Sequence, residues 1–123
     1  ISRALSRDIY QLTAYVDEEE EKRILAVLPH CTPQRWCPLS LDISPADGGK
    51  EVGIAQMLRH YGIAREEAMA LGDGQNDLGM LRYVGIGVAM GNAAECVRQA
   101  AGYVTGTVDE DGVYQALAHF GMI

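Results

Sequence analysis

Apolar positions recur along this chain with two spacings, one typical of strands and one of helices. Residues 9–16 alternate apolar and polar side chains, which favours a strand. Residues 17–28 have helical spacing and carry their acids in the first turn, where the helix dipole favours negative charge, and Pro29 ends this predicted helix. Residues 35–43 look extended. Three prolines restrict that segment to edge or irregular strands: Pro33, Pro38 and Pro45.

The second part of the chain alternates short apolar runs with amphipathic segments. Residues 50–61 form the clearest predicted helix, because apolar side chains recur there at i, i+3, i+4 and i+7, and Gly62 ends it. The pattern then predicts strands over 68–71, 86–89 and 102–104, which alternate with helices over 77–83, 93–100 and 112–120. Short strands and helices joined by short links predict an α/β fold, with a parallel sheet and flanking helices.

Length and composition limit the functions that this chain can have. Its 123 residues, 48% of them hydrophobic, suit one small domain or parts of two. A net charge of -7 argues against a nucleic-acid or anionic-membrane partner, and no apolar run approaches the roughly 18–20 residues of a membrane span. Cys31, Cys37 and Cys96 lack the paired spacing of a zinc site, so we expect reduced thiols in a cytoplasmic protein.

The candidate chemistry lies in the glycine-rich turn 72–77, directly after the apolar run 68–71. It carries Asp73 and Asp77, and the carboxyl ends of strands in open α/β sheets are where ligands bind. Mg²⁺ prefers a few carboxylates together with waters and phosphate oxygens, and Asn76 offers an amide that can donate to phosphate. The alternative is that the two carboxylates only cap the following helix.

The amino-acid sequence of this turn also resembles that of a known family. Gly72-Asp73-Gly74-Gln75-Asn76-Asp77 with Met80-Leu81, followed by Gly87-Val88-Ala89-Met90-Gly91-Asn92-Ala93, is similar to the haloacid dehalogenase (HAD) superfamily and, within it, to the Cof-type sugar-phosphate phosphatases. The resemblance covers residues 41–123. It implies the C-terminal half of a Rossmann-like core with a partial α+β cap. It also implies that Asp73 binds Mg²⁺, that Asp77 supports or shares that ligation, and that Asn76 contacts substrate phosphate.

Lys50 is the second candidate, because it opens a predicted helix ahead of Asp73 as the third motif of that family does. The resemblance implies that its charge neutralises the transferring phosphoryl group and the nucleophilic carboxylate. The alternative is a solvated lysine at a helix start, where the dipole mildly disfavours it. The usual sequence of this third motif in the family is Gly-Val-(Ser/Asn)-Lys-Gly. Here Gly49 is a weaker helix cap, and Glu51 puts an acid beside the expected phosphate contact.

The nucleophile of the family is the part that this sequence lacks. The resemblance implies an Asp-x-Asp-Gly motif at the end of a first strand. In this chain that motif occurs only at residues 109–112, after the metal motif and before the last predicted helix. We expect a turn and helix start there. The chain is therefore expected to be the C-terminal part of a phosphatase, with residues 1–44 from a cap and 45–123 from the core. We expect the isolated chain to have little phosphatase activity, because it lacks the nucleophile. We also expect its sheet to have an exposed edge, which pairs with a complementary N-terminal segment or with a second copy of the chain.

The leading hypothesis is a parent Mg²⁺-dependent phosphomonoester hydrolase that acts on small phosphorylated metabolites through an aspartyl-phosphate intermediate. A non-catalytic remnant that binds phosphate and Mg²⁺ is the alternative from another class. The phosphorylation domain of a P-type ATPase shares the Gly-Asp-Gly-x-Asn-Asp turn, but residues 78–81 and the lack of an apolar span argue against it. Two roles stay open for Tyr15, Arg35 and Trp36, which either line the site entrance or pack on an edge strand.

Overall fold

The computed structural model describes Ser6 and residues 8–123, apart from the side chain of Trp36. The remaining residues, 1–5 and 7, belong to the expected cap segment and lie outside this description. The chain divides into two compact units, residues 1–49 and 50–123. The division falls after Gly49, whereas the sequence was expected to divide after residue 44. Among the described residues, no helix has both the length and the apolar composition that crossing a bilayer requires.

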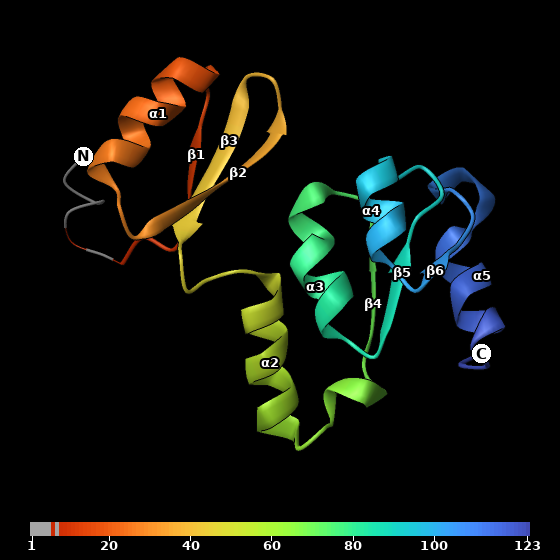
Figure 1. Cartoon of the computed structure of the whole chain (residues 1–123). Coiled ribbons are helices and arrows are strands. Elements are labelled where there is room, and N and C mark those ends of the chain that lie inside the picture. Colours follow the sequence, from red (N-terminus) through yellow and green to blue (C-terminus); the bar gives the residue numbers. More distant parts are fainter. Residues whose placement is uncertain (1–5, 7) are drawn as a thin grey trace. The chain divides into compact units, whose positions relative to one another are not determined.

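The first unit is a three-stranded antiparallel sheet with one helix (Figure 1). Its elements are β1 (Leu12–Ala14), α1 (Glu18–Val27), β2 (Cys31–Cys37) and β3 (Ser40–Pro45). The order β1-β3-β2 makes β3 the central strand, and its Leu41 and Ile43 side chains are buried. Thr13 on β1 faces Asp42 on β3, and its hydroxyl donates to the Asp42 carboxylate at 2.7 Å.

Helix α1 begins where its acidic first turn predicted. Asp17 is the N-cap, and its carboxylate accepts hydrogen bonds from the backbone N–H groups of Glu19 and Glu20, each at 2.9 Å. The Glu20 carboxylate in turn accepts from the backbone N–H of Asp17 at 3.3 Å, which completes a capping box. The charged run at the start of the helix is therefore explained by local capping.

The segment predicted to be extended is a hairpin of two strands. Pro38 lies in the turn between β2 and β3, since a proline has no N–H to give to a ladder. The prediction of an edge or irregular strand is confirmed for β2, which contains Pro33, pairs only with β3 among the described residues, and has a register irregularity between Arg35 and Cys37. It is wrong for β3, because this strand pairs with both neighbours and its only proline, Pro45, is its last residue.

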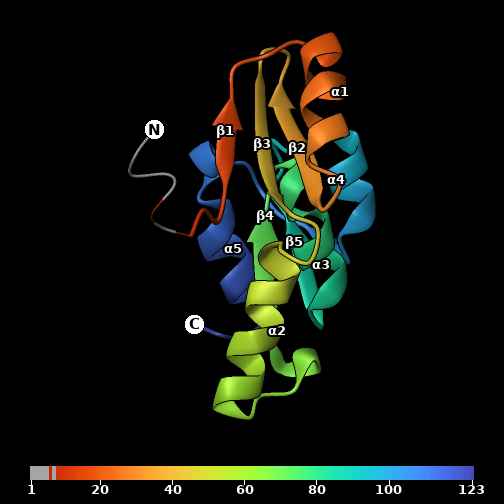
Figure 2. The same ribbon diagram turned by 90° about the vertical axis from the view of Figure 1, so that its left-hand side faces the viewer.

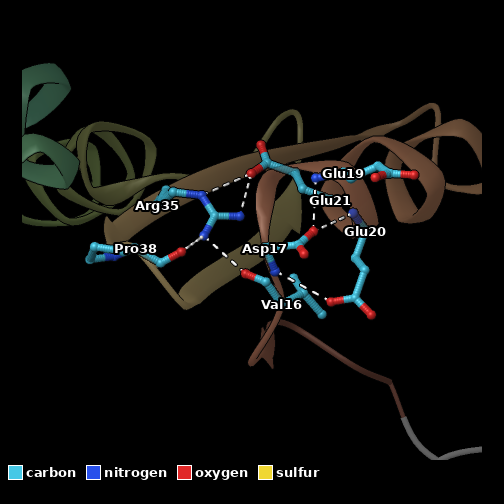
Figure 3. Close-up of polar contacts among 7 residues, drawn as sticks. All are labelled: Val16, Asp17, Glu19, Glu20, Glu21, Arg35 and Pro38. Atoms are coloured by element: carbon cyan, nitrogen blue, oxygen red, sulfur yellow. Dashed lines mark hydrogen bonds and ion pairs between the residues drawn. The ribbon is translucent and has the colours of Figure 1, made fainter.

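Arg35 on β2 joins α1 to the hairpin (Figure 3). Its Nε and Nη2 donate to Glu21 Oε2 at 3.0 and 2.6 Å, and its Nη1 donates to the carbonyl oxygens of Val16 and Pro38 at 3.0 and 2.7 Å. The Arg35 and Glu21 side chains are each only 20% exposed. Of the two roles considered for Arg35, these contacts support packing within the first unit.

The second unit is a parallel sheet of three strands with helices on both faces (Figures 1 and 2). The strands are β4 (Met69–Gly72), β5 (Ile86–Ala89) and β6 (Tyr103–Val104), in the order β4-β5-β6. The helices are α2 (Lys50–Tyr61), α3 (Leu78–Tyr83), α4 (Glu95–Ala100) and α5 (Gly112–His119). Each predicted element of this unit is present, with ends that differ by at most two residues, and the α/β class is confirmed.

Small and branched apolar side chains form the core of this unit. Helices α3 and α4 cover one face of the sheet, with α2 beside α3, and α5 lies on the opposite face (Figures 1 and 2). A buried cluster joins the sheet to α3 and α4: Ala70, Leu81, Val84, Ala89, Ala93 and Val97. Helix α2 ends at Tyr61 and is followed by Gly62, whose φ of 68° is in the left-handed region that a glycine after a helix adopts without strain.

Strand β4 lies at one edge of the parallel sheet. Within the described part of the chain it pairs only with β5, so its other side keeps free backbone donors and acceptors. Its side chains are apolar, and Ala70 is buried while Met69 and Leu71 are partly buried. An apolar strand with an open edge is a surface on which further strands can pair.

The guanidinium of Arg35 gives a test of what stabilises the first unit. Replacing Arg35 with Lys keeps the charge but removes the planar fork that reaches Glu21 and two carbonyl groups. We expect Arg35→Lys to lower the free energy of unfolding of this unit by about 2 kcal/mol. The measurement is urea denaturation followed through the NMR signals of β3.

A matched control exists in the same unit. Arg23 pairs with Glu19 at 2.6 Å, but these side chains are 74% and 76% exposed, so Arg23→Lys is expected to cost less than about 0.5 kcal/mol. Equal losses for the two substitutions would show that the Arg35 contacts do not hold α1 in place.

Candidate functional site

Polar side chains converge at the carboxyl ends of β4 and β5. A pocket of about 510 Å³ opens there, a volume within the range of sites for small molecules. Its polar lining comes from the start of α2, the turn after β4 and the segment after β5. The residues that line it are Lys50, Leu71, Gly72, Asp73, Asp77, Met80, Met90, Asn92, Val108 and Val113.

Asp77 is the buried centre of this site, with 4% of its surface exposed. Its Oδ1 accepts a hydrogen bond from Lys50 Nζ. Its Oδ2 accepts hydrogen bonds from the backbone N–H groups of Asp73 and Gly74, each at 3.0 Å. The carboxylate therefore closes the turn that follows β4 and ties it to the first residue of α2.

These donors determine the charge state of Asp77. Burial alone raises the pKa of a carboxyl group, because it disfavours the ionised form. The hydrogen bonds from Lys50, Gly74 and Asp73 and the positive charge of Lys50 outweigh burial and hold the pKa of Asp77 below its ordinary value. Asp77 is thus an anion at neutral pH, although its side chain is only 6% exposed.

Lys50 lines the pocket, and it lies at the start of α2, where the sequence predicted a helix to begin. Gly49 precedes it with a φ of 133°, and Lys50 is the first helical residue. About half of the Lys50 side chain, 49%, stays exposed while its ammonium pairs with Asp77. An ammonium that is held in place and still accessible can interact with an anion in the pocket.

Asp73 and Asn92 form the outer part of the site. Asp73 is exposed, and its Oδ2 accepts a hydrogen bond from Asn92 Nδ2 at 3.3 Å. Asn92 Oδ1 accepts from the backbone N–H of Val108 at 3.2 Å, so the amide is oriented from both ends. Asn92 belongs to the sequence motif 87–93, which by itself predicted no role for this residue. The available signal was its position just after β5, at the same sheet edge as Asp73.

Asn76 is the one predicted site residue that does not line the pocket formed by the described residues. It lies in the 3₁₀ turn Gln75–Asp77, and its Oδ1 is folded back toward Gly74, into the space that a Cβ on Gly74 would occupy. The structure thus brings together Lys50, Asp73 and Asp77. The role of Asn76 toward phosphate stays a prediction.

The segment 109–113 has the local structure that was expected of a turn and helix start. Val108–Glu110 is a 3₁₀ turn in which the Glu110 carboxylate accepts from the backbone N–H of Thr107 at 2.9 Å. Asp111 has a left-handed backbone, with φ of 56°, and α5 begins at Gly112. Neither acid of this Asp-x-Asp-Gly stands at a strand end, because β6 ends at Val104.

The donor set at the pocket fits Mg²⁺. That ion is usually bound by one or two protein carboxylates, with waters and phosphate oxygens in the other positions. Asp73 offers an accessible carboxylate. Both oxygens of Asp77 already accept hydrogen bonds, which suits a supporting position next to the ion. Among the described residues, no group of three or more His, Cys, Asp or Glu side chains is placed so that it could hold a metal ion.

Comparison with known proteins gives consistent matches. The family model described as haloacid dehalogenase-like hydrolase matches residues 2–117. The chain is similar to the solved HAD subclass IIB sugar phosphatase BT4131, with 46% identity and a TM-score of 0.89, over 99% of this chain and 47% of that one. It is also similar to BT1666 from Bacteroides thetaiotaomicron, analysed among phosphatases of the HAD superfamily, with 43% identity and a TM-score of 0.92, over 99% and 46%.

One similar protein is named for the substrate on which it acts. The 5-amino-6-(5-phospho-D-ribitylamino)uracil phosphatase YitU of Bacillus subtilis is 33% identical over 123 residues, which cover 94% of this chain and 46% of that protein. The chain therefore spans less than half the length of each of these three proteins.

The closeness of Gly72 to Asp77 makes the turn testable. A Cβ on Gly72 would stand 2.6 Å from Asp77 Cβ and 2.8 Å from Asp77 Oδ2. Because Asp77 Cβ is fixed by its own backbone, the side chain cannot rotate out of the way. We expect Gly72→Ala to lower the free energy of unfolding by about 1–3 kcal/mol, and to move the NMR signals of the Asp73 and Gly74 amides.

Gly102→Ala is the control for this substitution, because the nearest atom to its new Cβ would be the Gly87 carbonyl oxygen at 3.7 Å, an ordinary contact. Thermal unfolding and amide spectra of both variants decide the question. If Gly72→Ala unfolds at the same temperature as Gly102→Ala and leaves the two amide signals in place, Asp77 is not confined as described.

Proposed function

The chain belongs to the haloacid dehalogenase-like hydrolase family, and on this premise we propose that it is the metal- and phosphate-binding part of a Mg²⁺-dependent phosphomonoesterase. The observation that carries the proposal is the convergence of Lys50, Asp73 and Asp77 on one pocket at the carboxyl end of a parallel sheet. Two carboxylates and one ammonium in an open pocket match the charges that a phosphate ester and a divalent cation would bring.

Each residue has a distinct part in this proposal. Asp73 holds Mg²⁺ through its accessible carboxylate, and Asp77 supports that ligation and anchors Lys50. Lys50 lies beside the phosphoryl group and offsets its negative charge. Asn92 orients Asp73, and Asn76 contacts phosphate if its amide turns outward. When bound, Mg²⁺ supplies positive charge to the phosphoryl oxygens.

We propose that the nucleophilic aspartate comes from outside these 123 residues, and that an aspartyl-phosphate intermediate forms on it. The open edge of β4 supports this idea, because a strand that pairs there parallel to β4 would have its carboxyl end beside Asp73. Within this proposal the complementary N-terminal segment, or a second copy of the chain, covers that edge. The chain by itself is then expected to have little or no turnover.

The substrate class in this proposal is small phosphorylated metabolites. One similar protein is named as a sugar phosphatase and another as a phosphatase of a phosphoribitylamino-uracil, and both names denote small phosphorylated compounds. A pocket of about 510 Å³ has room for a molecule of that size. We place the protein in the cytoplasm, and the three unpaired cysteines support a reducing compartment.

The role of Asp73 can be tested in a protein completed at its N-terminus with the corresponding segment of its relatives. We expect Mg²⁺-dependent hydrolysis of a small phosphate ester, and Asp73→Asn should lower kcat/KM by more than about 100-fold, since even the outer partners of metal ligands contribute about 10–100-fold. Asp109→Asn is the control, because Asp109 is an exposed turn residue. It should leave the rate within about twofold, as surface substitutions usually do.

Three outcomes separate the readings. If Asp109→Asn abolishes turnover while Asp73→Asn does not, the assignment of the two acidic motifs is reversed. If the completed protein folds, binds Mg²⁺ and phosphate, and shows no hydrolysis, the chain belongs to a binding module. Hydrolysis that is unchanged without Mg²⁺ would contradict the metal role.

A further inference from the structure

We propose that Gly79 is a positioning residue, which gives Glu51 a place outside the pocket and so keeps Lys50 paired with Asp77. Glu51 follows Lys50 directly, where an acid would be expected to disturb a site for anions. The inference concerns the geometry of the Lys50–Asp77 pair and therefore does not depend on catalysis.

The contact joins the first turns of two helices. Glu51 is the second residue of α2 and Gly79 the second residue of α3, and these helices lie side by side (Figures 1 and 2). A Cβ on Gly79 would stand 2.5 Å from Glu51 Oε2, 2.7 Å from its Cδ and 3.0 Å from its Oε1. The Glu51 carboxylate thus lies directly against Gly79 and occupies the space that any other residue at position 79 would fill.

This placement directs the acid away from the pocket. Glu51 is partly buried, and it is not among the described residues that line the pocket, although its neighbour Lys50 is. The first turn of a helix also carries the positive end of the helix dipole, which stabilises a carboxylate. Glu51 therefore has a favourable position that does not compete for the Lys50 ammonium.

Gly79 is needed because of its missing side chain. Glycine is a poor helix former, so its presence in α3 lowers the stability of the helix. The space that it leaves for the Glu51 carboxylate offsets this cost. With any larger residue at position 79, the flexible Glu51 side chain has to rotate. In this proposal, a Glu51 carboxylate that has lost its place against α3 can reach the exposed Lys50 ammonium and compete with Asp77 for it.

A double-mutant cycle on the 123-residue chain tests the pair. The variants are Gly79→Ala, Glu51→Gly and the double substitution. The readouts are the melting temperature and the NMR signals of the Asp73 and Gly74 amides, which donate to Asp77. Gly53→Ala in α2 is the control for an ordinary helical glycine, since a Cβ there meets nothing within 4 Å.

We expect Gly53→Ala to raise the melting temperature by about 4 °C and to leave both amide signals in place. Gly79→Ala should give no such rise and should shift both signals. In the Glu51→Gly background the space is free, so the same Gly79→Ala change should raise the melting temperature by about 4 °C and no longer shift the signals.

A further variant separates charge from size. Combining Glu51→Gln with Gly79→Ala displaces a neutral amide that does not compete for the ammonium, so the amide signals should shift less than in Gly79→Ala alone. The proposal is overturned if Gly79→Ala behaves like Gly53→Ala, or if Glu51→Gly fails to remove its effect. Should Gly79→Ala not fold, a folded double variant would support the pair and an unfolded one would contradict it.

Discussion

The buried carboxylate of Asp77 is the group on which the site depends. A charge that has left water is stable only if donors surround it, and here one ammonium and two backbone N–H groups do so. The same bonds determine the shape of the turn after β4 and the position of the start of α2. The hydrogen bonds to this one side chain therefore hold together two segments that are separate in the sequence.

This constraint also explains why two glycines are found where they are. Gly72 lets Asp77 lie against the end of β4, and Gly79 leaves room for Glu51 beside the first turn of α3. At both positions another side chain lies where a Cβ would stand. Neither glycine has a positive φ, so a left-handed backbone is not the reason for it. A glycine-rich turn is thus a packing requirement around a charged group as much as a source of flexibility.

Several features followed from local sequence alone. The apolar spacing of residues 50–61 gave helix α2 its bounds, and the run 86–89 gave strand β5. The prediction was less accurate for residues 35–43, because whether a proline lies in a turn or at an edge depends on which strands pair across it. Arg35 shows the same limit. Its partners Glu21, Val16 and Pro38 come together only when α1 and the hairpin have folded.

The sequence by itself determined the α/β class, the order of the elements, the family, and the placement of Lys50, Asp73 and Asp77 at element ends, because periodicity and short motifs are local. The tertiary structure decided which of these residues meet. It paired Lys50 with Asp77, brought Asn92 to Asp73, and turned Asn76 and Glu51 elsewhere. Such choices depend on strand register, helix placement and the space between side chains, which act between residues far apart in the chain.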